Sequence, residues 1–375
     1  MEATPEQGLQ GCCASSRTPR NGSGLLSGEC SKLCRRRDRA TAAPLSIAIR
    51  DAHVQTAFLC VEHAVPAVLP SSFLYAIASL IWGSTWMAIT FQLGTVDPAA
   101  SVGYRFLLAG GLFLLWSRWL GEACRLPLRT LRWVALQGVL LFGISYTLTY
   151  EAERHIASGL MAVLNSSMLL FNLIGMRLAF GRTLDNKSLL GAGLGCLGIV
   201  LVFWPELSTV DDASGWLGVA CGLSAAVLAS IGNLVAQRQH QHGVPLLAGT
   251  GWAMILGGAT ALLIALAKGQ SLAFDTRPGY ILSLLYLALF GSVFAFAAYF
   301  TLLGRIGAGR AGYVAVAVPI LALILSAFFE GFVWQLWTVL GIACAVAGNL
   351  IMLLEPGQLR WLERLRRKPA TQPAP

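Results

Sequence analysis

The chain has 375 residues, of which 56% are apolar and only 12% are charged, and its formal net charge is +9. A soluble domain carries about 25% charged residues, because charge covers a water-facing surface. So little charge argues against a soluble globule and favours a membrane protein. The 40 glycines agree with this interpretation, since small residues let transmembrane helices approach one another closely.

Residues 1–70 differ from the rest of the chain. They are rich in Ser, Arg, Gly and Cys, include a basic run at 35–39, and lack both hydrophobic periodicity and the apolar core of a signal peptide. We expect a disordered basic tail, of which residues 1–67 are dispensable for insertion and transport. The alternative is a start codon assigned too far upstream. The spacing of the cysteines in this tail matches no familiar zinc motif, so neither a metal nor a cofactor is predicted.

From residue 73 onward the chain consists of apolar stretches of about 20 residues, the length that spans a bilayer. Very short connections at 151–155 and 330–333 require neighbouring spans to form antiparallel hairpins. Ten spans are predicted, at 73–93, 99–116, 133–150, 156–176, 188–204, 215–235, 244–267, 280–303, 311–329 and 334–354.

The distribution of Lys and Arg predicts the orientation. One set of loops holds only Arg154, Lys268 and Arg277, whereas the opposite loops and the C-terminal tail hold most of the cations. Cytoplasmic loops carry the excess of positive charge, so we expect both termini in the cytoplasm of a multi-pass inner-membrane protein. Topology then explains the net charge, and nucleic-acid binding is not needed.

Five spans, a polar segment and five more spans suggest a duplication. An odd number of spans per copy forces the second copy to insert upside down, a plan common among secondary transporters. The predicted fold class is an all-α polytopic membrane protein with ten transmembrane helices as two inverted five-helix repeats. The first half-repeat is 71–205, an external linker is 206–214, the second half-repeat is 215–355, and a basic cytoplasmic tail is 356–375.

Several short motifs resemble those of the EamA-type transporters of the drug/metabolite transporter superfamily. The resemblance covers residues 73–355 in family order and implies a membrane transporter. The motifs are Ile-Trp-Gly-Ser-Thr-Trp at 81–86, Tyr-Arg-Phe at 104–106, Ser158-Gly159 with 162–165, the stretch 191–204, and the second-half segment from 310–313 through Pro319 to 329–331.

Two positions depart from the family pattern. The family often has proline in the fourth span where this chain has Leu169, and Gly-Glu afterward where this chain has Gly181 and Arg182. The second half keeps both features, as Pro319 and Glu330. The two halves are therefore expected to differ in function.

Arg105 is the most informative residue of the spans. A charged side chain near the middle of a span costs about 3 kcal/mol on insertion scales, so it usually faces the bundle interior or a water-filled cavity. Arg105 is predicted either to attract an anionic group of a substrate or to have a structural role, in which it pairs with backbone carbonyls and fixes helix packing or extends to the membrane interface. Both interpretations stay open.

The other candidates for the substrate cavity are aromatic or polar. Trp82 and Trp86 lie one helical turn apart, and Tyr313 opens the ninth span; the alternative for such aromatics is an interfacial belt. Asn165 and Asn172 need partners at membrane depth, and most such residues hold helices together. Glu330 ends the ninth span on the outer side, where it either carries a coupling proton or caps a turn.

Enzyme signatures are absent from the sequence, including the Walker A, His-Glu-x-x-His and Gly-x-Ser-x-Gly motifs. We therefore predict no enzyme but a secondary transporter that exports a small metabolite, amino-acid-like or drug-like, by alternating access. Its partners are the solute and the lipid bilayer, with proton or exchange coupling left open, as is the oligomeric state. The alternatives are a nucleotide-sugar or sugar-phosphate antiporter, a membrane-embedded enzyme and a non-transporting scaffold.

Overall fold

The computed structural model describes residues 69–121, 124–181, 186–209, 213–299, 301–302, 305 and 314–353, and within these ranges every regular element is a helix. The described residues belong to one compact unit, 53–375. The predicted tails, apart from residues 69–70, and Tyr313 lie outside the described residues.

The first half of the bundle contains α3 to α9. The third helix of this half is continuous but has a π-helical segment, η1, in its middle. The elements are α3 (Ser71–Thr90), α4 (Pro98–Trp119), α5 (Leu128–Gln137), η1 (Gly138–Ser145), α6 (Tyr146–Ala152), α7 (Ser158–Ser166), α8 (Met168–Phe180) and α9 (Asn186–Thr209).

The second half of the chain begins with α10. Its third helix again holds a π-helical segment, η2, and continues as helix to Tyr299. The elements are α10 (Ala213–Gln241), α11 (Leu246–Ala267), α12 (Pro278–Ala288), η2 (Leu289–Phe294), α14 (Val314–Phe329) and α15 (Leu336–Leu353). A π-helical turn is rare and is often found at functional sites. Because one occurs in the third helix of both halves, these two helices are candidates for contributing to a functional site.

Seven of the described helices are long and apolar enough to cross a membrane. They are Ser71–Thr90, Pro98–Trp119, Leu128–Ala152, Ser158–Ala179, Ser214–Gln239, Leu246–Ala267 and Pro278–Tyr299. Three shorter apolar helices, Leu189–Val202, Val314–Phe329 and Leu336–Ile351, complete the set within the described ranges. The chain is therefore a polytopic helical membrane protein.

Local sequence signals begin and end several helices. The carboxylate of Asp97 accepts a hydrogen bond from the Ala99 backbone N–H at 2.9 Å, and Pro98 occupies the first turn of α4. Gly181 ends α8 with φ of 66°, a left-handed conformation that glycine adopts at little cost.

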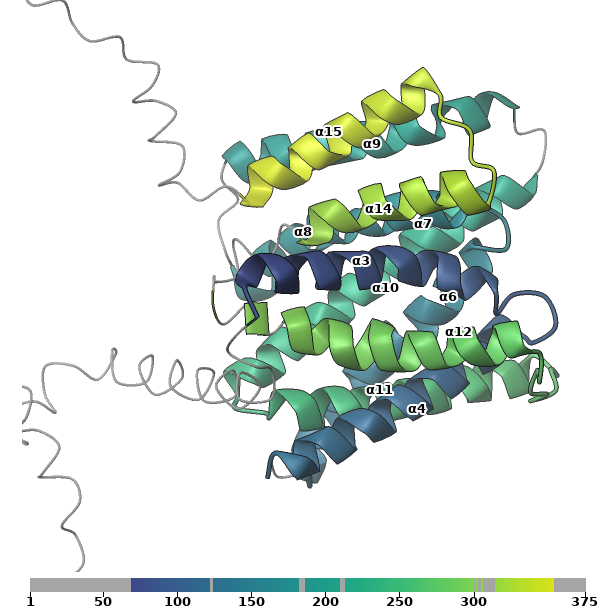
Figure 1. Cartoon of the computed structure of the whole chain (residues 1–375). Coiled ribbons are helices and arrows are strands. Elements are labelled where there is room, and N and C mark those ends of the chain that lie inside the picture. The colour runs from purple at the N-terminus through teal and green to yellow at the C-terminus, as the bar shows by residue number, and fades with distance from the viewer. Residues whose placement is uncertain are drawn as a thin grey trace, which may run out of the picture. The chain divides into compact units, whose positions relative to one another are not determined.

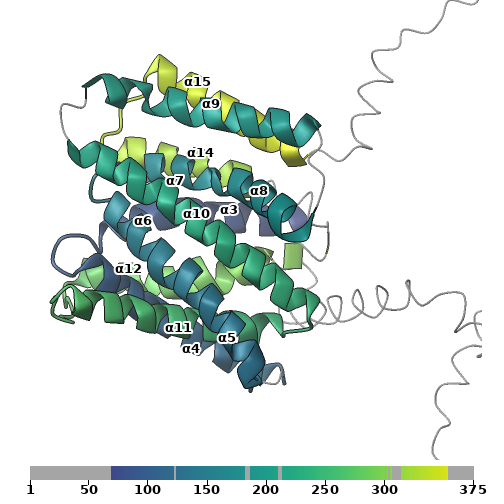
Figure 2. The same ribbon diagram turned by 180° about the vertical axis from the view of Figure 1, so that it is seen from behind.

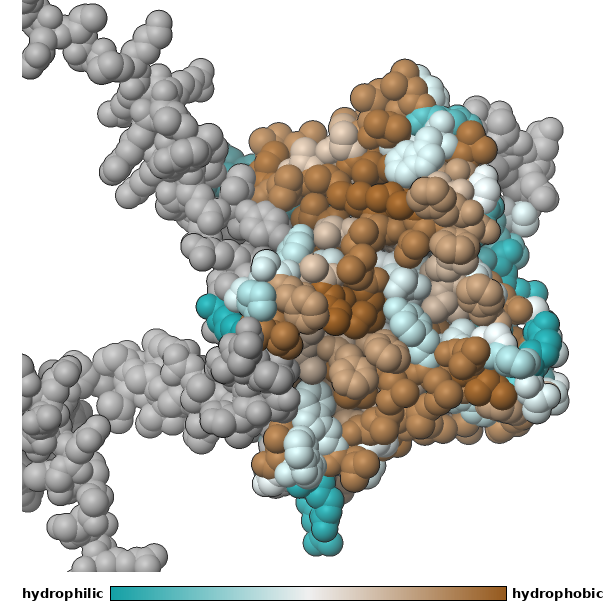
Figure 3. All heavy atoms as spheres, in the orientation of Figure 1, coloured by the Kyte–Doolittle hydropathy of each residue, from teal (hydrophilic) through white to brown (hydrophobic). Residues whose placement is uncertain are grey.

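The surface is apolar along the sides of the helices. Leu178 and Phe328 are 80% and 81% exposed, and many other large aliphatic and aromatic side chains are also exposed. Figure 3 shows this apolar surface, with hydrophilic residues gathered at the end of the bundle that lies to the right. An exposed apolar surface of this extent needs lipid rather than water around it.

Helices of the two halves lie side by side. α9 runs along α15, and α4 runs along α11, as both ribbon views show (Figures 1 and 2). Glycines make the α9–α15 approach possible, because a Cβ atom at Gly198 would lie 2.6 Å from the Gly341 carbonyl oxygen. Such contacts between backbones are typical of helix packing in membranes.

The helix boundaries differ from the predicted spans in two ways. α9 and α10 continue to Thr209 and Gln241, past the predicted ends at residues 204 and 235, because hydropathy marks the apolar part of a helix and not its polar extension. The predicted fourth span, 156–176, is interrupted at Ser167. There the preceding Ser166 hydroxyl donates to the Val163 carbonyl at 2.6 Å, a bond that bends helices.

Candidate functional site

Arg105 lies at the centre of a buried polar network. It projects from α4, and only 3% of it is exposed. Its Nη1 donates to the Tyr150 hydroxyl on α6 at 3.3 Å, and that hydroxyl donates to Oε1 of Gln92, just beyond the end of α3, at 2.9 Å. The prediction that Arg105 faces the bundle interior agrees with this position.

Two aromatic rings flank the guanidinium group. Its carbon atom lies 5.1 Å from the ring centroids of both Phe106 and Tyr146, which is within cation–π range. The two rings pack edge to face with centroids 4.6 Å apart. The positive charge is therefore held in a defined orientation without a hydrogen-bonded carboxylate.

Two donors of this network have no hydrogen-bond partner among the described residues, namely Nε of Arg105 and Nε2 of Gln92. Buried donors are normally paired, because an unpaired one forfeits its hydration. Unpaired donors beside a buried positive charge make a site that favours an acceptor group, above all an anionic one.

Residues of the second half lie on the opposite side of the Arg105 network. A Cβ atom built on Gly291 in η2 would lie 3.7 Å from Nη2 of Arg105 and 2.8 Å from Cγ2 of Thr85 on α3. The Gly291 carbonyl oxygen accepts a hydrogen bond from Nε1 of Trp82 at 3.1 Å. The site therefore lies where α3, α4 and α6 of the first half meet the π-helical segment of the second.

The two tryptophans of α3 belong to different clusters, although the sequence placed them on one face. Trp82 packs against Phe296 and Tyr299, with ring centroids 5.3 and 5.2 Å away. Trp86 packs against the buried cluster that includes Leu160 of α7. Trp82 thus holds η2 in place, while Trp86 lies against α7.

Glu330 bridges the two halves in the turn after α14. Its Oε2 accepts a hydrogen bond from the Ser158 backbone N–H at 3.1 Å and another from the Ser326 hydroxyl. The first bond caps the beginning of α7, which matches the turn role considered in the sequence. It also joins the α6–α7 turn to the α14–α15 turn.

Glu153 is a site residue that the sequence analysis missed. It follows α6 directly, only 7% of it is exposed, and neither carboxyl oxygen has a hydrogen-bond partner within the described part of the chain. The sequence analysis gives it only as part of the short connection 151–155. One signal was present in the sequence, because Tyr146, Tyr150 and Glu153 follow the i, i+4, i+7 spacing of a single helix face.

Among the described residues, Asn165 and Asn172 do not join this network. Asn165 is half-buried in α7. Asn172 is half-buried in α8, and its Oδ1 has no hydrogen-bond partner among the described residues. Tyr313 lies outside the described ranges. No group of three or more His, Cys, Asp or Glu side chains that could hold a metal ion occurs in the part of the chain that the structure describes.

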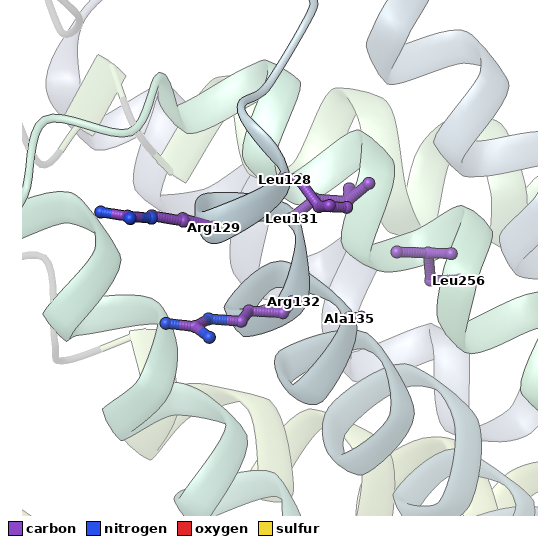
Figure 4. A pocket seen from close by; sticks show the side chains of 6 residues that line it. All are labelled: Leu128, Arg129, Leu131, Arg132, Ala135 and Leu256. Atoms are coloured by element: carbon purple, nitrogen blue, oxygen red, sulfur yellow. The ribbon is translucent and has the colours of Figure 1, made fainter.

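A separate hollow of about 430 Å³ lies between α5 and α11. It is lined by Leu128, Arg129, Leu131, Arg132, Ala135 and Leu256. In Figure 4 the two arginine side chains extend to the side of α5 away from Leu256. Leu128 is 81% exposed, so this hollow opens on the outer surface, and it shares no residue with the Arg105 network.

A family model described as "EamA-like transporter family" matches the chain twice, at residues 69–204 and 216–354. The chain belongs to the EamA-like transporter family. The two matches divide the chain near the predicted boundary between the halves, at 205–215. The resemblance inferred from the short motifs is therefore confirmed, and the membrane-transport assignment follows from it.

Three relatives of this EamA-family chain come from bacteria. "Uncharacterized inner membrane transporter YedA" of Escherichia coli is 30% identical over 67% of this chain and 80% of its own length. "Protein PagO" of Salmonella typhimurium is 26% identical over 76% of this chain and 92% of its own length. "Uncharacterized transporter YoaV" of Bacillus subtilis is 25% identical over 65% and 83%.

A solved structure described only as "Crystal structure of protein" has a similar fold. It superposes with a TM-score of 0.57 and 16% sequence identity, and the match covers 78% of this chain and 98% of the other. At this identity the likeness concerns the fold alone.

Proposed function

We propose that this EamA-family chain is a secondary transporter that exports a small, amino-acid-like solute with an acidic group by alternating access. Membership of the family and the names of the relatives make it a membrane transporter of the drug/metabolite type. The solute class and the mechanism are our proposal. The observation that carries it is the buried Arg105 with its unpaired Nε donor.

A carboxylate is the group that best fits this arrangement. The planar fork of a guanidinium matches the two oxygens of a carboxylate, and charge-assisted bonds of this kind are about twice as strong as neutral ones. Gln92 adds a second donor, and the rings of Phe106 and Tyr146 keep the guanidinium in place. We assign Arg105 the role of anchor for the acidic group.

The proposed architecture is ten transmembrane helices in two inverted five-helix repeats, with both termini cytoplasmic. The double family match and the π-helical segment in the third helix of each half support the duplication. The pairing of α9 with α15 and of α4 with α11 supports a pseudo-symmetric arrangement of the two halves.

Reporter fusions test the topology. A fusion after Asp212 is expected to be active only with a reporter that works outside the cytoplasm, because the positive-inside bias places the linker there. A fusion after Leu354 is expected to be active only with a cytoplasmic reporter. Cytoplasmic activity of the first fusion would contradict the inverted repeat.

A counterflow screen tests the solute class. Proteoliposomes loaded with each member of a panel of amino acids, their amides, sugar phosphates and nucleotide sugars are given a trace of the labelled compound outside. We expect at least one compound with a free carboxylate to accumulate above protein-free liposomes and its amide to fail, because the amide lacks the charge that Arg105 attracts. Accumulation of only uncharged compounds would contradict the proposal, and accumulation of only phosphorylated ones would favour the antiporter alternative.

A cellular measurement tests the direction. Cells that overproduce the chain are expected to hold less of the transported solute inside and to release more of it to the medium than cells with the Arg105→Ala variant. A higher internal level in the overproducing cells would indicate uptake.

A further inference from the structure

Two carboxylates of one turn have opposite environments. Glu151 is partly exposed, and its Oε1 lies 3.1 Å from Nη1 of Arg154. Glu153, two residues later, is buried, and both of its oxygens lack a hydrogen-bond partner among the described residues. Buried carboxylates are normally paired with cations or with several donors. An ionised Glu153 would therefore carry a large desolvation cost that no hydrogen bond offsets.

The charges near Glu153 come from both halves of the bundle. Arg105 of α4, Glu330 of the turn after α14 and the Tyr150 hydroxyl of α6 are close enough to Glu153 for their charges to act on it. Within the same turn, Glu151, Arg154 and His155 interact among themselves.

The positive charge of Arg105 balances one carboxylate ion among Glu153 and Glu330, but not two. Glu330 accepts hydrogen bonds from the Ser158 N–H and the Ser326 hydroxyl, so a negative charge there has two donors beside it. Arg105 supplies one positive charge against it. A second ion at Glu153 would add a negative charge without a donor to hold it.

The pKa of Glu153 follows from this environment. The residue lies one position beyond the span Leu128–Ala152. Burial raises the pKa of its carboxyl group well above the ordinary value, the charge of Glu330 raises it further, and the charge of Arg105 lowers it. Buried and closed to solvent, the carboxyl group is neutral over a range of pH in which an exposed glutamate is ionised.

We propose that Glu153 is a proton-binding site that couples proton movement to the opening of the bundle at the end where Ser158 meets Glu330. The proposal rests on the transport function proposed above. A proton suits the site because it needs no space, and the hollow between α5 and α11 does not include Glu153.

The coupling follows from the bond between the halves. With Glu153 protonated, the two carboxyl groups stay close and Glu330 holds the beginning of α7. When this end opens and water reaches Glu153, the carboxyl group gives its proton to water, leaving a carboxylate and a hydronium ion. The carboxylate then repels Glu330 and opposes closure until it is protonated again.

Infrared difference spectroscopy of the purified chain in liposomes tests proton binding without any solute. We expect the C=O band of a protonated carboxyl group to persist at neutral pH in the wild type and in the control Glu151→Gln, and to be lost in Glu153→Gln. Absence of the band in the wild type at neutral pH, or its persistence in Glu153→Gln, would overturn the proposal.

A second variant tests the role of Glu330 and serves if Glu153→Gln does not fold. Glu330→Gln removes the negative neighbour, so the band of Glu153 is expected to disappear at a lower pH than in the wild type. An unchanged titration would show that the two groups do not interact and would refute the coupling.

The two proposals fail in distinguishable ways. A Glu153 band without counterflow of any carboxylate compound would reject the solute class and keep the proton site. Counterflow without the band would keep the transporter and reject the proton site. With both present, Glu153→Gln is expected to retain exchange of solute for solute and to lose accumulation driven by a pH gradient. Gradient-driven accumulation by Glu153→Gln would reject the coupling.

Discussion

Replacing Arg105 with alanine is expected to lower transport of the carboxylate solute by about tenfold to a hundredfold, because a hydrogen bond to a charged group contributes about 1.5 to 3 kcal/mol. The variant should still insert, since α4 becomes more apolar and the Tyr150 hydroxyl keeps its bond to Gln92. The measurement is the initial rate of counterflow per molecule of inserted protein.

Arg105→Lys separates charge from geometry. Lysine keeps the positive charge but lacks the planar fork, so we expect transport between that of the wild type and that of Arg105→Ala. Arg118→Ala is the matched control, because Arg118 is exposed near the end of the same helix. Wild-type transport in both Arg105 variants would remove Arg105 from the site, and failure of Arg105→Ala to fold would assign it to helix packing.

Replacing Gly198 with alanine is expected to destabilise the bundle by about 3 kcal/mol, the upper end of the usual cost of overpacking. The new Cβ atom would lie 2.6 Å from both the Gly341 carbonyl oxygen and the Ala345 backbone nitrogen, and backbone atoms cannot move aside as a side chain can. We expect a lower yield of monodisperse protein and a Tm lower by about 5 to 10 °C.

Gly193→Ala is the control on the same helix. A Cβ atom there would have no heavy atom within 4 Å, and alanine is about 1 kcal/mol more favourable than glycine inside a helix. The Tm of this variant is expected to stay or to rise. Equal Tm values for the two alanine variants would contradict the close contact between α9 and α15.

The sequence predicts the membrane class, the family and the burial of Arg105, because each follows from a local property. Hydropathy locates the apolar stretches, and the cost of a charge in lipid indicates that an arginine within a span faces inward. The bond between Glu330 and Ser158 could not be predicted in this way. It joins residues 172 positions apart, and only the packing of α7 against α14 brings them together.

The burial of Glu153 also could not be predicted from the sequence. Sequence reasoning places a glutamate in a five-residue connection at the surface, whereas packing of neighbouring turns covers it. The contacts of the tryptophans of α3 could not be predicted for a related reason. Helical spacing gives the face of Trp82 and Trp86, but the partners of that face change along the helix, from Phe296 near Trp82 to the α7 cluster near Trp86.

The π-helical segments have a consequence for insertions and deletions in this family. Each residue of an α-helix advances it by about 100°, so losing one residue rotates everything beyond it out of register. A segment with i→i+5 bonds holds a surplus residue, and its loss returns the helix to i→i+4 bonding without a break. Gly138–Ser145 and Leu289–Phe294 are therefore the segments where the third helix of each half can shorten by one residue and remain continuous. Such a deletion in η2 leaves the helix beyond it in register, so Phe296 and Tyr299 still face Trp82 in a relative with the shorter helix.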